Sequence, residues 1–191
     1  EFRRVLFRSR ALASRQPGSI FKPFVYTAAL TAYRDGAVSQ PWTPMSTVND
    51  EPTTFEFDQK PYQPANYGRD YYGEVTLRTA LMKSLNVATV KVAQSAGFDR
   101  VVKLARAAGL NNRIQATPAV ALGAYEVTPV EIAGAYTMFA NRGIHVAPFF
   151  LSMVRSKGGA LLDVNYPRPK GVIGPEVAYV ITTMQIGRAH V

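Results

Sequence analysis

The sequence predicts an α+β fold in which helices predominate and the sheet is small. Apolar residues recur at helical spacing from Phe21 onward. Helix-capping signals recur along the chain, and residues 128–131 (TPVE) are the clearest of them. Residues 156–159 (SKGG) form a turn signal between two short β-type segments. With 191 residues, of which 47% are hydrophobic, the chain is long enough to bury one sizeable core.

The first helix is predicted to begin near Phe21. Apolar residues keep helical spacing as far as Ala32, on one face of an amphipathic helix, and Gly36 is well placed to end it. Residues 37–73 contain repeated prolines among Thr, Asp, Gln and Tyr, a composition that resists helix formation. We expect an ordered, extended excursion here, and loops of this length are often functional.

The rest of the chain is predicted to hold further helices and one hairpin. Thr76 is a good cap for a short helix that runs through Lys83, and Asn86 is a good cap for the next helix. The TPVE segment combines a capping box with a proline at the first helical position. The expected helices after Asn86 cover residues 87–96, 99–108, 129 to about 141 and 175–184, and the expected hairpin strands cover residues 149–155 and 160–164.

The stretch QPGSIFKPF places Ser19 three residues before Lys22, at the expected helix start. Residues three apart share a helix face, so the amine of Lys22 can return to the hydroxyl of Ser19. A lysine activates a serine only where burial and neighbouring cations lower the pKa of its amine, and Phe21 and Phe24 can supply a dry environment. The alternative is that Ser19 merely caps the helix, and spacing alone favours that interpretation.

Pro23 and the segment KSLN add two observations. A proline soon after a helix start removes a backbone hydrogen bond and disfavours helical geometry at Lys22, which indicates a functional or strained site. Ser84-Leu85-Asn86 is the only Ser-x-Asn in the chain, and it lies between two predicted helices where both polar side chains can project into a cleft. Capping explains Asn86 equally well but leaves Ser84 without a role.

Three segments together resemble the transpeptidase domain of bifunctional class A penicillin-binding proteins. They are RQPGSIFKPFVYTAAL, NYGRDYYGEVTLRTALMKSLNVATVKVA and ALGAYEVTPVEIAGAYTMFANRG, in the family's order and at suitable spacing. The resemblance covers nearly all of residues 10–184. It implies a penicillin-binding and serine β-lactamase-like transpeptidase fold, of which this chain holds mostly the helical part plus a small hairpin, with the central sheet incomplete.

The resemblance implies a peptidoglycan D,D-transpeptidase that works through a serine acyl-enzyme and is a target of β-lactams. Ser19 is implied to attack the carbonyl between the two terminal D-alanines of a stem peptide, and Lys22 to take its proton. Ser84 is implied to relay that proton to the leaving amine, and Asn86 to hydrogen-bond the substrate amide and Lys22. The implied partners are peptidoglycan stem peptides and β-lactams. The full-length protein is implied to be membrane-anchored, with an upstream glycosyltransferase domain, at the periplasmic face of the inner membrane in the bacterial cell envelope.

The sequence departs from the family in one respect, because it contains neither Lys-Thr-Gly nor Lys-Ser-Gly. In the family that third motif supplies an oxyanion-hole N–H group and a substrate-carboxylate anchor. We therefore expect this polypeptide to be a truncated fragment that is inactive or nearly so. Two alternatives remain open: a serine D,D-carboxypeptidase or β-lactamase-type hydrolase, and a non-catalytic β-lactam sensor domain. A β-lactamase needs an added carboxylate, and the spacing of Glu74 and Glu126 marks neither for that role.

Both ends of the chain have an unusual origin in our interpretation. Residues 1–9 (EFRRVLFRS) translate the oligonucleotide GAG TTC AGA CGT GTG CTC TTC CGA TCT, an adapter of short-read sequencing libraries. Residues 186–191 translate its reverse complement, which also completes a codon for Gln185. We expect both ends to be adapter-derived scars around a partial transpeptidase domain at residues 10–184. Part of the formal net charge of +9 comes from arginines in these ends.

Composition argues against several classes of protein. The chain has no cysteine, so it holds no disulfide and no thiolate metal site, and only His145 and His190 offer imidazole. We expect no metal ion and no cofactor, and we expect His145 to be a packing or surface residue. Lys and Arg are scattered rather than gathered into a stripe with aromatic residues, which argues against nucleic-acid binding. No run of about 18 apolar residues is present, so no membrane span is expected in this chain.

Overall fold

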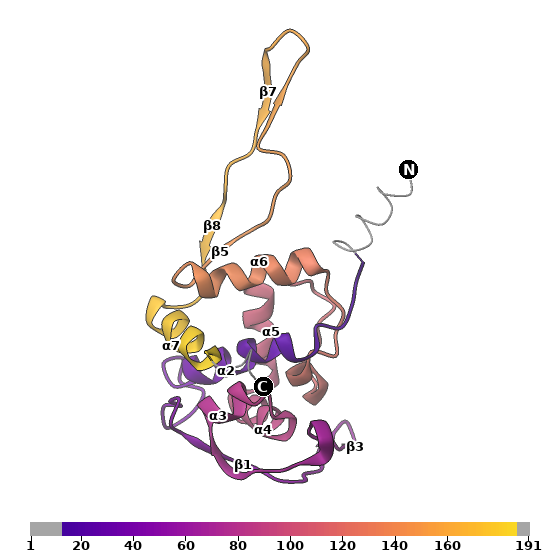
Figure 1. Ribbon diagram of the computed structural model, residues 1–191, viewed down its shortest axis with the longest axis vertical. Coiled ribbons are helices and arrows are strands. Elements are labelled where there is room, and N and C mark those ends of the chain that lie inside the picture. Colours follow the sequence, from indigo (N-terminus) through magenta and orange to yellow (C-terminus); the bar gives the residue numbers. More distant parts are fainter. Residues whose placement is uncertain (1–12, 187–191) are drawn as a thin grey trace.

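The computed structural model describes residues 13–186. The predicted scar at residues 1–9 and most of the one at residues 185–191 lie outside the described residues. Figure 1 shows a helical body with small two-stranded sheets at its periphery, from which one long hairpin projects. In residues 13–186 no helix combines the length and the apolar character that a membrane crossing needs.

Helix α2 (Lys22–Ala32) lies at the centre of the helical body (Figure 1). Every residue of this helix except Leu30 is buried. The helices that pack against it include α3 (Leu77–Met82), α4 (Asn86–Ala96), α5 (Phe98–Ala107) and α7 (Pro175–Gln185). The prediction of an amphipathic helix is therefore wrong, because neighbours cover α2 on all sides and leave it no solvent face.

Two of the predicted local caps, at Thr76 and Thr128, start their helices as expected. Thr76 caps α3 by accepting a hydrogen bond from the backbone N–H of Thr79. Helix α6 (Pro129–Ala140) starts with the full capping box between Thr128 and Glu131. The final helix α7 begins at Pro175, as expected. A short 3-10 helix, η3 (Pro118–Leu122), precedes α6 and was not predicted.

Four aromatic rings join the start of α2 to α6. Phe21 stacks on Phe24 with the ring centroids 5.3 Å apart. Phe24 in turn meets Tyr136 and Phe139 of α6 edge to face, at 5.8 and 5.5 Å. Such contacts add to the stability that burial of the rings already provides. The start of α2 is therefore firmly attached to α6.

The predicted extended excursion is ordered and forms two small antiparallel pairs. Strand β1 (Thr47–Asp50) pairs with β4 (Gly73–Thr76), with Asp50 opposite Gly73. Strand β2 (Phe55–Phe57) pairs with β3 (Lys60–Tyr62), and a 3-10 turn, η2 (Tyr67–Arg69), follows. The β1–β4 pair contacts α4. The excursion is thereby attached to the helix that begins at Asn86.

A hairpin arm extends from the end of α6 (Figure 1). At its base β5 (Ile144–Val146) pairs with β8 (Pro169–Gly171), and farther out β6 (Met153–Arg155) pairs with β7 (Leu161–Val164). The predicted hairpin is confirmed, with a shorter first strand than expected. All sheets within residues 13–186 are two-stranded, so the structure has an incomplete sheet.

His145 lies at the base of this arm and is a packing residue. Its side chain is 8% exposed. The ring packs against Gly109, where an added Cβ would lie 2.8 Å from Nε2 of His145. Burial, and then the charge of Lys170, lower the pKa of His145 below its ordinary value. Lys170 is its cross-strand neighbour in the β5–β8 pair.

Candidate active site

Ser19 lies in a 3-10 turn, η1 (Gly18–Phe21), that leads directly into α2. The residue before this turn is Pro17, and the residue before α2 is Phe21, and neither makes a side-chain capping hydrogen bond. Ser19 is therefore inside the turn and does not occupy a cap position, so the capping interpretation is wrong. Its side chain is exposed.

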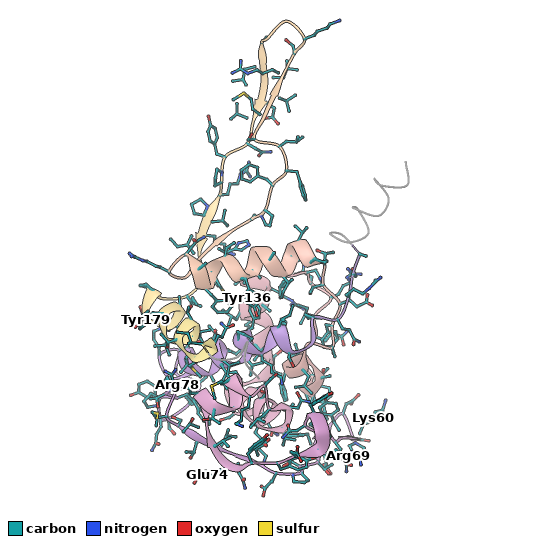
Figure 2. All side chains as sticks on the ribbon, in the orientation of Figure 1. Lys60, Arg69, Glu74, Arg78, Tyr136 and Tyr179 are labelled. Atoms are coloured by element: carbon teal, nitrogen blue, oxygen red, sulfur yellow. The ribbon has the colours of Figure 1, made fainter. Side chains whose placement is uncertain are left out.

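The backbone of the Ser19 turn is held by contacts with two distant segments. The N–H of Gly18 donates to the carbonyl oxygen of Gly123 at 3.1 Å. Gly123 has φ +66°, and a Cβ on it would lie 2.4 Å from the carbonyl oxygen of Gly18. From α6 the hydroxyl of Tyr136, on the side toward the helical body in Figure 2, donates to the carbonyl oxygen of Ile20 at 2.5 Å. Sequence analysis missed both Gly123 and Tyr136, since neither belongs to a recognisable short motif.

Pro23 fits its position without strain. Because α2 begins at Lys22, Pro23 is the second helical residue, in the first turn of the helix where proline is tolerated. Lys22 itself has helical angles, φ −53° and ψ −39°. The prediction that this proline breaks a local rule is wrong, since the preceding 3-10 turn places it within the first turn of α2.

Lys22 is completely buried and points toward the loop between α3 and α4. Its Nζ donates to the carbonyl oxygen of Ser84 at 2.5 Å, to Oγ of Ser84 at 3.1 Å and to Oδ1 of Asn86 at 2.7 Å. These partners are 62 and 64 residues away in the chain. The structure therefore brings three of the four predicted site residues into direct contact, and the fourth, Ser19, lies in the turn that leads into α2.

Ser84 adopts a backbone conformation that serine rarely takes. Its φ is +58°, in the left-handed region, where a Cβ is unfavourable. The residue lies between the end of α3 and the start of α4. In this conformation both the carbonyl oxygen and Oγ of Ser84 reach the same amine. Local strain of this kind is typical of sites where geometry is set by function.

Asn86 does not cap α4, contrary to prediction. It is the first residue of α4, the preceding Leu85 makes no side-chain cap, and Oδ1 of Asn86 binds Lys22 instead. The cap comes from Asn66, whose Oδ1 accepts from the backbone N–H groups of Asn86 and Val87 at 2.7 and 3.3 Å. A cap supplied from 20 residues upstream leaves no signal in local sequence.

Three tyrosines of the extended excursion and Glu74 take varied positions. Tyr67 is fully exposed, whereas Tyr71 packs against the core. The ring of Tyr72 lies 4.5 Å from Nζ of Lys83. Oε1 of Glu74, labelled in Figure 2, accepts a hydrogen bond from the Thr47 hydroxyl across the β1–β4 pair. Residues 13–186 hold no group of three His, Cys, Asp or Glu that is arranged to bind a metal ion.

Comparison with known proteins identifies the class. Residues 3–184 match the family described as the penicillin-binding protein transpeptidase domain. Penicillin-binding protein 1A of Pseudomonas aeruginosa is 38% identical over 160 residues, which make up 82% of this chain and 18% of that protein. The chain belongs to the penicillin-binding protein transpeptidase family, and it spans less than a fifth of this relative's length.

Solved structures share the fold. Penicillin-binding protein 1A from Haemophilus influenzae matches with a TM-score of 0.80 at 27% identity, over 92% of this chain and 30% of that one. Penicillin-binding protein A from M. tuberculosis, solved as a penicillin G acyl-enzyme complex, has a TM-score of 0.79 at 25% identity. That match covers 95% of this chain and 45% of the other. The predicted transpeptidase fold is confirmed.

Proposed function

We propose that this chain carries the nucleophile and base of a peptidoglycan D,D-transpeptidase that cross-links stem peptides through a serine acyl-enzyme. In this proposal Ser19 is the nucleophile and Lys22 is its base. Ser84 relays the proton, and Asn86 hydrogen-bonds both the substrate amide and Lys22. The observation that carries the proposal is the fully buried Nζ of Lys22, which is bound by Ser84 and Asn86.

The environment of Lys22 suits a base. Complete burial disfavours the ammonium form of an amine, whereas three oxygen acceptors favour it. A base has to take up a proton and then release it to a neighbouring group during the reaction. Oγ of Ser84, at 3.1 Å, is close enough to receive the proton and pass it toward a leaving amine.

Acylation then proceeds in two steps. Ser19 Oγ bonds to the carbonyl carbon of the penultimate D-alanine as its proton passes to Lys22, and the peptide bond breaks as that proton reaches the departing D-alanine through Ser84. An amine of a neighbouring strand next attacks the ester, forms the cross-link and frees Ser19. A β-lactam acylates Ser19 through the same two steps, but the amine that its ring opening releases stays attached to the acyl group and does not depart.

The similarity to penicillin-binding proteins supports the proposed partners and location. β-Lactams and peptidoglycan stem peptides are the expected ligands, and the whole protein is expected at the periplasmic face of the bacterial inner membrane, with a membrane anchor. The sequence has no Lys-Thr-Gly or Lys-Ser-Gly, so we expect the isolated chain to be acylated slowly or not at all. Residues 10–184 remain the proposed partial transpeptidase domain.

A chimera tests the nucleophile. Residues 10–184 replace the matching segment of penicillin-binding protein 1A from Pseudomonas aeruginosa, which supplies the remaining length of the domain. We expect a fluorescent penicillin to label this chimera at one residue, to be identified as Ser19 by peptide mass spectrometry. Ser19→Ala should abolish labelling. Continued labelling of the Ser19→Ala chimera, or labelling at a different residue, would refute the proposal.

A further inference from the structure

Asn86 is held from two sides by the segment that contains Ala65 and Asn66. Nδ2 of Asn86 donates to the carbonyl oxygen of Ala65 at 2.7 Å. Since the donors and the acceptor of a side-chain amide point in different directions, this bond leaves Oδ1 of Asn86 facing Nζ of Lys22. The backbone N–H of Asn86 is bound separately, by Oδ1 of Asn66 at 2.7 Å. Residues 65 and 66 therefore fix both the backbone and the side chain of Asn86.

The amide of Asn66 makes four hydrogen bonds that determine its own orientation. Oδ1 accepts from the backbone N–H groups of Asn86 and Val87. Nδ2 donates to Oδ2 of Asp50 at 2.8 Å and to the carbonyl oxygen of Asp70 at 2.9 Å. A flipped amide would bring donors against donors and acceptors against acceptors, so one orientation alone satisfies all four groups. Asn66 is 7% exposed, so water does not replace these partners easily.

Asp50 anchors Asn66 from the end of β1. Its side chain is fully buried, and its Oδ2 also accepts from the backbone N–H of Tyr72 at 3.2 Å. Its Oδ1 is buried without a hydrogen-bond partner among residues 13–186. A buried oxygen without a partner costs free energy. The stability of this loop therefore does not by itself account for a carboxylate at position 50.

We propose that Asn66 is a positioning residue for acylation of Ser19, acting through Asn86 on Lys22, and that Asp50 anchors Asn66 in this role. The proposal rests on the function proposed above, because it treats Lys22 as the base. The hydrogen bonds are continuous along this route. Oδ2 of Asp50 binds the amide of Asn66, which in turn binds the backbone of Asn86 at the start of α4. Oδ1 of Asn86 then binds Nζ of Lys22. A shift of Asn66 moves Asn86, and with it the acceptor Oδ1 of Asn86, away from Nζ of Lys22.

Asn66 also caps α4, and a cap alone contributes to stability. The two roles give different results in acylation kinetics. Loss of a cap lowers the fraction of folded protein but leaves each folded molecule with a normal site. Loss of positioning lowers the maximal acylation rate of the folded molecules themselves. The rate at saturating penicillin, corrected for the folded fraction, therefore separates the two roles.

The first experiment compares two lost caps in the chimera. We expect Asn66→Ala to lower the maximal acylation rate by a fluorescent penicillin by about tenfold or more, because small displacements of catalytic groups are costly. The matched control is Thr128→Ala, which removes the cap of α6 and is expected to acylate at the parent rate. A parent rate in the Asn66→Ala chimera overturns the proposal.

The second experiment asks whether Asn66 acts through Asn86. Two residues on one route are non-additive in a double-mutant cycle. In an Asn86→Ala background, we therefore expect Asn66→Ala to cause little further decrease in the maximal rate. A further decrease as large as that in the parent background contradicts the assigned route. Asp50→Ala should likewise lose most of its effect on the maximal rate once Asn66 is replaced by Ala.

A third variant keeps the test decisive if Asn66→Ala does not fold. Asn66→Asp keeps an acceptor for the two N–H groups of α4 and suits a helix N-terminus, but it replaces the donor to Asp50 with a second carboxylate that repels it. We expect Asn66→Asp to lower the maximal acylation rate. Adding Asp50→Asn should restore part of the lost rate, because it supplies a donor between positions 50 and 66. A parent rate in Asn66→Asp overturns the proposal.

Failure of the proposed function gives a different pattern. If Ser19 is not the nucleophile, the Ser19→Ala chimera still becomes labelled. If Asn66 has no positioning role, labelling depends on Ser19, and Asn66→Ala changes the folded fraction without changing the maximal rate.

Discussion

Nζ of Lys22 and Oδ1 of Asn86 lie 2.7 Å apart although 64 residues separate them in the chain. The contact joins the start of the central helix α2 to the start of α4, which packs against it. Asn86 is oriented for this contact by the carbonyl oxygen of Ala65 rather than by its own helix. The extended excursion between α2 and α3 therefore contributes to the candidate site, as the length of that segment suggested.

Ser84 offers a test that separates backbone strain from chemistry. Because its φ is +58°, Ser84→Gly relieves strain that Ser84→Ala retains, while both remove the hydroxyl near Lys22. We expect the glycine variant to be more stable than the alanine variant by about 1 kcal/mol in urea unfolding. Both should acylate at similarly low rates in the chimera. Equal stabilities would show that the left-handed conformation carries no cost here.

Gly123 should tolerate no side chain. A Cβ there would lie 2.4 Å from the carbonyl oxygen of Gly18, so Gly123→Ala must displace the Ser19 turn. We expect a loss of about 2 kcal/mol or more in the free energy of unfolding, together with slowed acylation.

Gly36→Ala is the matched control for that variant. Gly36 has a similar φ of +71° but nothing within 4 Å of an added Cβ. It should lose only the conformational part, about 1 kcal/mol, and acylate normally. Similar losses of stability and rate in the two variants would mean that the close approach of Gly123 to Gly18 is unimportant.

Tyr136 is expected to steady the Ser19 turn through its hydroxyl. Tyr136→Phe keeps the ring against Phe24 and Phe139 but removes the hydrogen bond to the carbonyl oxygen of Ile20. A loss of about 1 kcal/mol in stability is expected, with acylation slowed several-fold. Tyr179→Phe, at an exposed site on α7 (Figure 2), serves as control and should change neither quantity. An unaltered acylation rate in Tyr136→Phe would leave its hydroxyl with a purely structural role.

Acid should destabilise the chain through His145. Because burial and then Lys170 lower the folded-state pKa of His145 below 6.5, the unfolded chain takes up this proton first as pH falls. As pH falls, the loss of stability therefore begins near the pKa that His145 has in the unfolded chain. The loss is complete below the pKa that His145 has in the folded chain. Urea unfolding between about pH 8 and about pH 5 measures this loss.

Two variants test the assignment to His145. His145→Asn should reduce the change in the free energy of unfolding between these two pH values, since no imidazole remains at position 145 to take up the proton. Lys170→Gln should reduce it, because one of the two causes of the lowered pKa is then removed. An identical pH dependence in the parent chain and in His145→Asn would assign the acid sensitivity to other groups.

Most helices could be predicted because their signals are local. Thr76 and Thr128 cap the helices that directly follow them, and the hydrogen bonds involved span three residues. Most strands could not, since each is only three or four residues long and too short to show a clear alternation. Pro23 was misjudged for a related reason, because the 3-10 turn Gly18–Phe21 precedes α2 and leaves Pro23 in the first turn of that helix.

For the candidate site, too, local sequence predicted some features and tertiary structure alone decided the others. Local sequence was enough to single out Ser19, Lys22, Ser84 and Asn86 and, with the flanking segments, the family to which the chain belongs. Tertiary structure alone decided that Lys22 is fully buried against Ser84 and Asn86. It also decided which distant residues make the contacts around these side chains, namely Asp50, Ala65, Asn66, Gly123 and Tyr136. Their contacts cross 16 to 116 residues of chain, and hydrogen bonds over such separations depend on how helices and loops pack, which residue spacing does not encode.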